Sequence, residues 1–168
     1  MKYKKLSKDF YMQPCLRAAG DLIGKVLVRK KGSRVYSGII VETEAYLGSR
    51  DAASHSFNGP TKRNEVMFGE GGLAYVYFTY GNHYCVNAVT GKAGVAHAVL
   101  IRALEPIEGI RYMLKNRNTD DVYRLCSGPG NLCRAMEIDG SLNGVTLLGD
   151  EIFIAEPPRG NKKKVKRT

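Results

Sequence analysis

The chain has 168 residues, of which 43% are hydrophobic and 25% are charged, so its composition is that of a globular protein and excludes a disordered one. This length is sufficient for one domain with a buried core and is short for two. Lysine and arginine number 26 against 16 aspartate and glutamate residues, which gives a net charge of +10. That charge suits nucleic acid, an anionic membrane surface or no specific partner, and by itself it selects none of them.

Positive charge is concentrated at the C-terminal end of the sequence. Residues 159–168 contain six lysines and arginines and no acidic residue, which leaves the rest of the chain at +4. We therefore expect one domain over residues 1–158 and a basic tail over residues 159–168. No stretch is apolar and long enough to cross a bilayer, and the basic N-terminus lacks the apolar core of a secretory signal. We expect no membrane partner and no secretion, with a cytoplasmic or nucleoid location in a prokaryote and a nuclear one in a eukaryote.

The cysteines and histidines do not have the spacing of a metal site. Cys15, Cys85, Cys126 and Cys133 form no CxxC pair, and the three histidines are scattered. In a chain that is not exported, such cysteines are expected to be reduced and buried. We expect no metal and no cofactor.

The first half of the chain predicts one helix and a hairpin, followed by a long polar segment. Residues 14–22 have helical spacing at Leu16, Ala19 and Leu22, and Gly24 ends that helix. Strands are expected over residues 25–30 and 35–46. Residues 47–72 are polar and rich in Gly, Ser and Asn, and so long a loop inside a compact domain is usually functional or disordered.

The second half adds a second hairpin around Gly81-Asn82, with strands over residues 73–80 and 84–89. A strand over 96–104 follows, then a helix that begins at Pro106, ends near Arg117 and turns Ile107, Ile110 and Leu114 inward. The remaining prediction is a helix from Ser127-Gly128-Pro129 to Met136 and strands within 145–154. Because hairpins dominate and no βαβ unit appears, we expect an α+β fold. It would be a single compact domain with a mainly antiparallel, curved β-sheet, packed helices and a protruding β-hairpin.

Two carboxylates interrupt an otherwise apolar strand in the sequence 39–46. Strand periodicity places Ile40, Glu42, Glu44 and Tyr46 on one face. Such a face is unsuited to a core and plausible for an active site, where two acids could act across a glycosidic bond. An edge strand with its acids in water is an equally good interpretation of this pattern alone.

Aromatic residues crowd the second hairpin, which carries Tyr75, Tyr77, Tyr80 and Tyr84. Ordinary sheet packing explains at least two of them, because tyrosine is a good strand former. Tyr80 is different, since a tyrosine beside an exposed turn is shaped to wedge between stacked bases from the minor groove. Arg102 lies within the apolar run 98–104 and therefore needs an anionic partner, either a carboxylate or a phosphate.

The segment Glu42-Thr43-Glu44-Ala45-Tyr46-Leu47-Gly48, followed by His55-Ser56, resembles the alkyladenine (3-methyladenine, or methylpurine) DNA glycosylases of the human-enzyme type. Further blocks agree in order over residues 10–154: Arg63-Asn64, Met67-Phe68, Tyr75-Val76-Tyr77, Tyr80-Gly81, Cys85-Val86-Asn87, Arg102-Ala103-Leu104-Glu105-Pro106 and Leu125-Cys126-Ser127-Gly128-Pro129. Each block alone is weak, and together they are specific. The family normally continues with a further C-terminal segment, and we expect that segment to be absent here, either in a natural short form or in a truncated chain.

The resemblance implies a role for each matching position. Glu44 matches the general base that activates the attacking water, and Arg102 matches an arginine beside that water and the target backbone. The walls of the flipped-base pocket are matched by Tyr46, His55 and Tyr77, with Asn87 at the purine 2-position. Tyr80 matches the wedge that fills the duplex, and Arg63 lies in the segment that holds phosphates. Glu42 has no transferable role, and we interpret it as structural.

The resemblance thus predicts a monofunctional DNA glycosylase of base excision repair, whose partner is double-stranded DNA containing damaged purines. It would act as a monomer, flip alkylated or deaminated purines (the 3-methyladenine, hypoxanthine and ethenoadenine class) and hydrolyse the N-glycosidic bond with water. No lysine lies in the matched catalytic blocks, so base release without strand cleavage is expected. The strongest alternative is a non-catalytic basic nucleic-acid-binding module on the same scaffold. An O-glycoside hydrolase that uses Glu42 and Glu44 is a weaker one.

Overall fold

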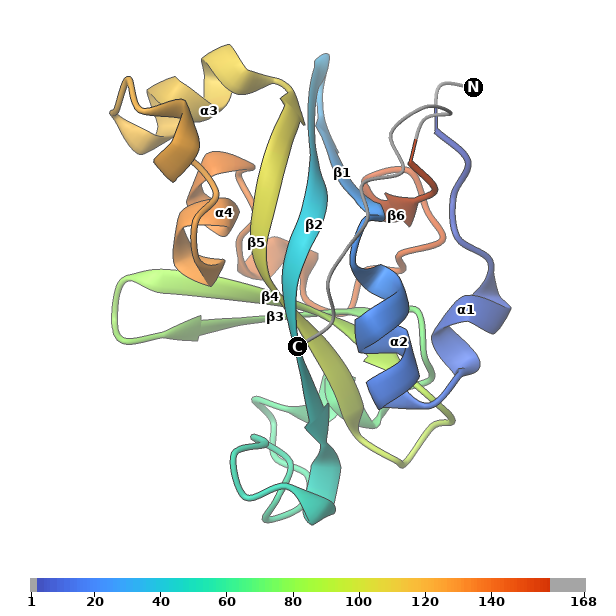
Figure 1. The fold of residues 1–168 in the computed structure, drawn as a ribbon. Coiled ribbons are helices and arrows are strands. Elements are labelled where there is room, and N and C mark those ends of the chain that lie inside the picture. The colour runs from blue at the N-terminus through green and yellow to red at the C-terminus, as the bar shows by residue number, and fades with distance from the viewer. Residues whose placement is uncertain (1–2, 158–168) are drawn as a thin grey trace.

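The structure, a computed structural model, describes residues 3–157, and Figure 1 shows a twisted antiparallel sheet with helices packed around it. The tail over residues 159–168 lies outside the described residues. The sheet has six strands in the order β3-β4-β5-β2-β1-β6. The strands are β1 (Val26–Lys31), β2 (Arg34–Leu47), β3 (Ala74–Thr79), β4 (His83–Thr90), β5 (His97–Glu108) and β6 (Ile152–Ala155). All pairs are antiparallel, which confirms the α+β fold.

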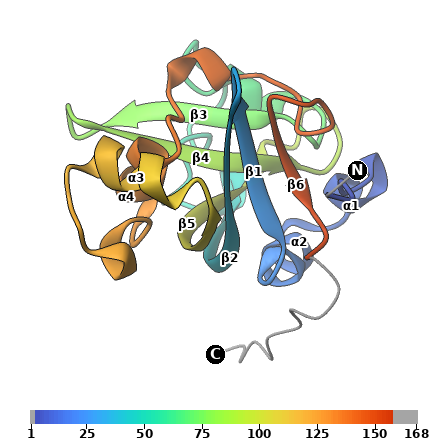
Figure 2. The same cartoon turned by 90° about the horizontal axis from the view of Figure 1, so that it is seen from above.

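The helices are short and flank the sheet: α1 (Lys8–Met12), α2 (Cys15–Leu22), α3 (Ile110–Arg117) and α4 (Pro129–Ala135). Single 3-10 turns occupy Gly48–Arg50, Glu65–Phe68, Val122–Arg124 and Gly140–Leu142. Seen from above, β3 and β4 run across the direction of β1, β2 and β6, so the sheet is strongly curled (Figure 2). Among residues 3–157, no helix is both long and apolar enough to span a membrane.

The main core lies between one face of the sheet and the helices. Helix α2 contributes Cys15, Ala18, Ala19 and Leu22, which follow helical spacing and are all buried. Leu16, which the sequence pattern placed on this apolar face, is 67% exposed instead. The apolar stripe begins one residue earlier than expected because a small buried cysteine serves as its first member. All four cysteines are buried and free, as expected.

Pro106 does not open a helix, and that prediction was wrong. Strand β5 continues through Pro106 to Glu108, and α3 begins only at Ile110, after Gly109 with φ of 81°. Proline cannot donate a ladder hydrogen bond, and it is accommodated because it pairs with Gly38 where the β2–β5 register shifts. A Cβ on Gly38 would lie 2.9 Å from Leu104 Cβ, so glycine permits this close approach.

The three residues predicted to face inward from that helix belong to two different elements, β5 and α3. Ile107 belongs to β5 and packs in a second cluster on the opposite face of the sheet. Ile110 and Leu114 pack against the main core, but the fully buried residue of α3 is Met113. Between residues 145 and 157, only Ile152–Ala155 form a strand, whereas Thr146 makes an isolated bridge to Leu73.

Candidate active site

A break in the β2 register creates the candidate site. The pairing of β2 with β5 shifts on both sides of Glu42, so regular alternation is lost there. Ile40 packs in the main core, and so do Ala45 and Leu47 further along the strand. The expectation that Ile40 shares a face with Glu44 was therefore wrong. The irregularity turns Glu44 out of the core, which is a common use of bulges beside active sites.

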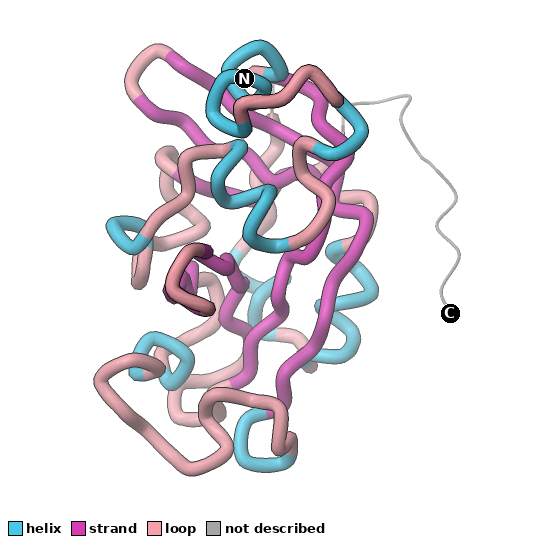
Figure 3. Tube along the Cα trace, turned by 90° about the vertical axis from the view of Figure 1, so that its left-hand side faces the viewer, coloured by secondary structure: helices cyan, strands magenta, loops and turns pink. Residues whose placement is uncertain are grey.

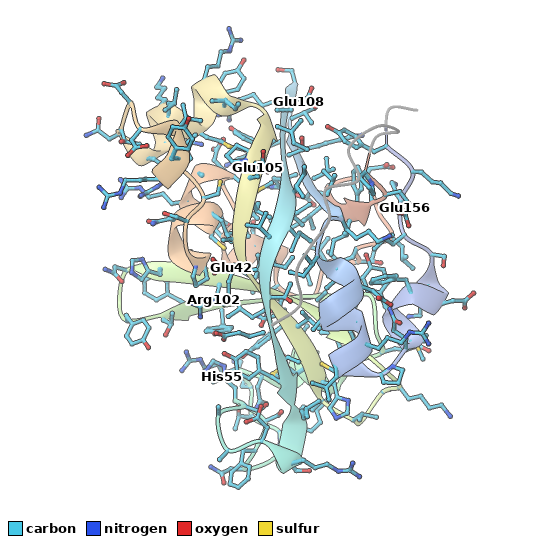
Figure 4. All side chains as sticks on the ribbon, in the orientation of Figure 1. Glu42, His55, Arg102, Glu105, Glu108 and Glu156 are labelled. Carbon is cyan, nitrogen blue, oxygen red and sulfur yellow. The ribbon has the colours of Figure 1, made fainter. Side chains whose placement is uncertain are left out.

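Glu44, Arg102 and Tyr46 form a hydrogen-bonded group on this outer face. Arg102 Nη1 donates to Glu44 Oε1 at 2.6 Å, and the Tyr46 hydroxyl donates to Glu44 Oε2 at 2.7 Å. Glu42 is farther away, with Oε2 3.7 Å from Arg102 Nε, and its side chain is 61% exposed. Figure 4 shows Glu42 beside Arg102, with His55 further down the same side. The anionic partner that the sequence required for Arg102 is thus a pair of carboxylates.

An aromatic cluster adjoins the carboxylate. The rings of His55 and Tyr77 meet edge to face with centroids 4.4 Å apart, and Tyr75 and Tyr77 lie 5.1 Å apart. His55 Nδ1 shares a hydrogen bond of 3.1 Å with the Tyr75 hydroxyl. Asn87, which is almost fully buried, donates from Nδ2 to the Tyr75 carbonyl at 3.1 Å. These side chains are brought together by β3, by β4 and by the segment of residues 48–73, which connects β2 to β3.

The polar segment that carries His55 is folded by its own side chains. Asn64 is buried and donates from Nδ2 to the carbonyls of His55 at 2.8 Å and Gly59 at 3.0 Å. Ser56 donates to the Ala96 carbonyl, which attaches the loop to the sheet. Figure 3 shows the segment as loops and short helical turns gathered at one end of the molecule. The segment is therefore ordered, which excludes the disordered alternative for so long a loop.

The histidine and the tyrosines of the aromatic cluster are uncharged at pH 7. Burial and the nearby Arg63 cation lower the pKa of His55 from its usual value near 6.5, so the imidazole is neutral at pH 7. Burial, followed by the hydrogen bond to Glu44, raises the pKa of Tyr46 to about 12. Burial likewise raises the pKa of Tyr75 to about 12 and that of Tyr77 well above its usual value. All three phenols are therefore protonated at pH 7, and that of Tyr46 donates to Glu44.

A small cavity lies inside this cluster. Its volume is about 30 Å³, and it is lined by Tyr46, Ala53, His55, Met67, Tyr75, Tyr77 and Asn87. That volume exceeds the roughly 10–15 Å³ that a cavity needs to hold one water molecule. Four lining residues were among the predicted pocket residues, whereas Tyr75, Met67 and Ala53 were assigned no role. The blocks Met67-Phe68 and Tyr75-Val76-Tyr77 were a usable signal for two of them, but nothing in the sequence pointed to Ala53.

Tyr80 stands at the tip of the β3–β4 hairpin, as the sequence predicted. Its side chain is 90% exposed, and its φ of 52° lies in the left-handed region, as does that of Gly81 at 71°. A left-handed tyrosine costs about 1 kcal/mol that a glycine would avoid. Arg63 approaches the same hairpin near its tip, where Nη2 donates to the Phe78 carbonyl at 2.9 Å and the guanidinium lies 5.6 Å from the Tyr77 ring centroid.

Within residues 3–157, no three His, Cys, Asp or Glu side chains are grouped so that they could hold a metal ion. The site residues are carboxylate, guanidinium, phenol, imidazole and amide groups that already pair with one another.

Comparison with known proteins identifies the family. The model for the family described as methylpurine-DNA glycosylase matches residues 9–168. A relative from Chlorobium phaeobacteroides (strain BS1), named "Putative 3-methyladenine DNA glycosylase", is 53% identical over 152 residues, which cover 90% of this chain and 76% of the relative. A relative of the same name from Desulfitobacterium hafniense (strain Y51) is 47% identical, with coverage of 91% and 80%.

An α+β domain with a carboxylate–arginine pair beside an aromatic pocket and a sequence match of this extent define a DNA glycosylase. The chain belongs to the methylpurine-DNA glycosylase family. It is accordingly an enzyme of the DNA-3-methyladenine glycosylase class, a hydrolase of N-glycosyl bonds.

Proposed function

We propose that this enzyme flips alkylated or deaminated purines out of duplex DNA and releases them with a water molecule that Glu44 activates. The observation that carries the proposal is the position of Glu44, which Arg102 and Tyr46 hold beside the aromatic cavity. Each carboxylate oxygen accepts one hydrogen bond from the protein and keeps a lone pair for water. A positioned carboxylate base accelerates such a step by about 10²–10⁴-fold.

The chemistry of the pocket suits a cationic purine. A purine alkylated on its ring carries positive charge and is already a good leaving group, so flipping and water positioning remain the main tasks. Tyrosine faces attract a cation by about 0.5–2 kcal/mol, and stacking contributes about 1–3 kcal/mol per base. The neutral state of His55 matters here because a protonated imidazole would repel the same cation.

The purine must widen the cavity, because about 30 Å³ is far below the few hundred Å³ of ordinary small-molecule pockets. Tyr46 and His55 approach the cavity from β2 and from the 48–73 segment, whereas Tyr75, Tyr77 and Asn87 lie on the paired strands β3 and β4. We propose that base entry moves His55 and its loop away from Tyr75 and Tyr77, while Tyr46 keeps its hydrogen bond to Glu44. No lysine lines the cavity in the described part of the chain, which favours water over an enzyme amine as the nucleophile.

The direct test uses duplexes that each contain one 3-methyladenine analogue, hypoxanthine or ethenoadenine. Incubation with the protein and then with hot alkali should break the strand at the lesion, whereas incubation without alkali should leave it intact. Strand breaks without alkali would indicate a lyase and contradict the water mechanism. Release of none of these bases would contradict the proposed substrate class.

A further inference from the structure

We propose that a second cleft, on the other side of the β3–β4 hairpin from the aromatic pocket, binds backbone phosphates of the DNA strand opposite the lesion. This proposal rests on the proposed function, because it assumes that the hairpin tip enters a duplex. The cleft has a volume of about 360 Å³. The residues that matter for the argument are Asn82 and His83 from the hairpin, Arg117 from the end of α3, and Gly130, Asn131 and Arg134 from α4.

The cleft begins beside the wedge. Asn82 and His83 follow Tyr80 by two and three residues, so one end of the cleft lies at the hairpin tip. In Figure 1 the hairpin lies between α4 above and the 48–73 loop below, so the cleft and the aromatic pocket are on opposite sides of it. The minor groove is only about 6 Å wide, and a hairpin inserted there has one DNA strand on each side. Because the flipped base enters the aromatic pocket, the other strand is left to face the cleft.

Two guanidinium groups in the cleft have unused donors. Arg117 donates through Nε to the Leu125 carbonyl at 3.2 Å, and Arg134 donates through Nε to the Asn116 carbonyl at 3.1 Å. These bonds fix both planes, and the Nη groups of Arg117 and Arg134 have no partner among the described residues. A fixed guanidinium with free Nη donors is suited to a phosphate oxygen pair.

The acidic residues of the cleft are already occupied. Glu137 forms ion pairs with Lys31 at 2.9 Å and Arg34 at 2.7 Å and also accepts a hydrogen bond from the Tyr36 hydroxyl. Asp139 accepts two hydrogen bonds at Oδ1 from the backbone and hydroxyl of Ser141. The lining thus carries Lys31, Arg117 and Arg134 against the two carboxylates, and Arg34 pairs with Glu137 from outside the cleft. Positive charge remains in excess and makes the cleft attractive to an anion.

The ring of His83 packs against Gly130 of α4. A Cβ on Gly130 would lie 2.8 Å from Cγ and 2.9 Å from Nδ1 of His83, so only glycine lets the ring rest against the first turn of α4. The exposed ring makes no hydrogen bond with the described residues, which leaves its N–H free at the mouth of the cleft. The hairpin is thereby attached to the element that carries Arg134.

The test compares two double variants that remove the same charge. Arg117→Gln/Arg134→Gln empties the cleft of its free cations, and Arg111→Gln/Lys115→Gln removes two exposed cations from α3 outside it. Binding to a lesion duplex is measured against salt. Each lost phosphate contact reduces the magnitude of the slope of log K against log salt by about 0.9. The magnitude of the slope should therefore fall by about 1–2 in the cleft variant and by much less in the α3 variant. Equal slopes for the two double variants would overturn the proposal.

Ethylation interference identifies the strand. For the wild-type protein, ethylated phosphates on the strand opposite the lesion should inhibit binding, and this interference should vanish in the cleft variant. Interference confined to the lesion strand would overturn the assignment. Displacement of the duplex by deoxyadenosine monophosphate or inorganic phosphate at low concentration would assign the cleft to a free anion and also overturn it.

Two controls distinguish loss of the cleft contacts from unfolding of the variant and from failure of the proposed function. If the double glutamine variant melts early, Asn131→Asp places a negative charge in the cleft with little change of shape, and it should weaken duplex binding several-fold. The single-turnover rate of base release with saturating protein tests the proposed function independently of the cleft. An unchanged rate with a reduced salt slope supports the cleft, whereas no release by the wild-type protein counts against the proposed function alone.

Discussion

Arg102 on β5 donates a hydrogen bond of 2.6 Å to Glu44 on β2, and these two residues are separated by 58 positions in the sequence. The bond joins neighbouring strands at the place where their register is irregular. It orients one carboxylate oxygen, while Tyr46 orients the other. The geometry of the proposed base is therefore set by the sheet and does not depend on a mobile loop.

Glu44→Gln should lower single-turnover base release by about 10²–10⁴-fold while lesion binding changes by less than about tenfold. The amide nearly preserves the shape of the side chain, but it cannot accept a proton from water. Glu42→Gln is the matched control, because this exposed residue makes only a 3.7 Å contact with Arg102. It should change release by no more than a few-fold, as expected for an exposed ion pair. Near-normal release by Glu44→Gln would remove Glu44 from the mechanism.

Tyr80→Asn should reduce binding and excision of a paired lesion by roughly tenfold or more, because the wedge offsets an unstacking cost of a few kcal/mol. Asparagine is chosen because it tolerates the left-handed backbone at this position. The same lesion in a single strand should be released at a nearly unchanged rate. Tyr123→Asn is the matched control, since Tyr123 is 96% exposed on a separate turn. Equal losses on paired and single-stranded lesions would mean that Tyr80 only supports the hairpin.

Asn87→Ser should raise the release of guanine relative to hypoxanthine. Guanine differs by an amino group at position 2, and crowding that group by Asn87 would cost on the order of 1–3 kcal/mol. The measurement is the ratio of single-turnover rates on matched duplexes, with guanine mispaired. Since Asn87 also donates to the Tyr75 carbonyl, a melting curve should accompany the rates. A proportional loss on every substrate would show that Asn87 maintains the pocket and does not select the base.

His55 should make the enzyme less stable below about pH 6.5. Its pKa is lowered in the folded state by burial and by Arg63, so the unfolded chain binds more protons as the pH falls. The stability that neutral His55 contributes is fully present above the usual histidine pKa. It is lost as the pH falls through the lowered pKa that His55 has in the folded protein. The fall in Tm between pH 7.5 and pH 5 should therefore be smaller in His55→Gln. His97→Gln is a parallel variant, because burial and Arg50 lower the pKa of His97 as well. An unchanged pH dependence in both variants would contradict this account.

The sequence alone determined the local features of this protein. Turn residues and alternating apolar positions predicted the hairpins, and they placed Tyr80 at an exposed tip. Glu44 and Tyr46 were correctly placed on one strand face, since two residues on a regular strand share a side. The ordered motif blocks led to the family that the comparisons show.

Only the tertiary structure decided the features that depend on distant partners. Strand periodicity put Ile40 beside Glu44, but pairing with β5 introduced an irregularity that separated them. Pro106 resembled a helix start, yet the close approach of Gly38 allowed β5 to continue through it. The order of the 48–73 segment depends on a buried Asn64, whose carbonyl partners no local pattern could indicate. A single sequence records propensities of neighbouring residues, whereas register, cavity size and the partners of Arg102 are set by which strands meet in space.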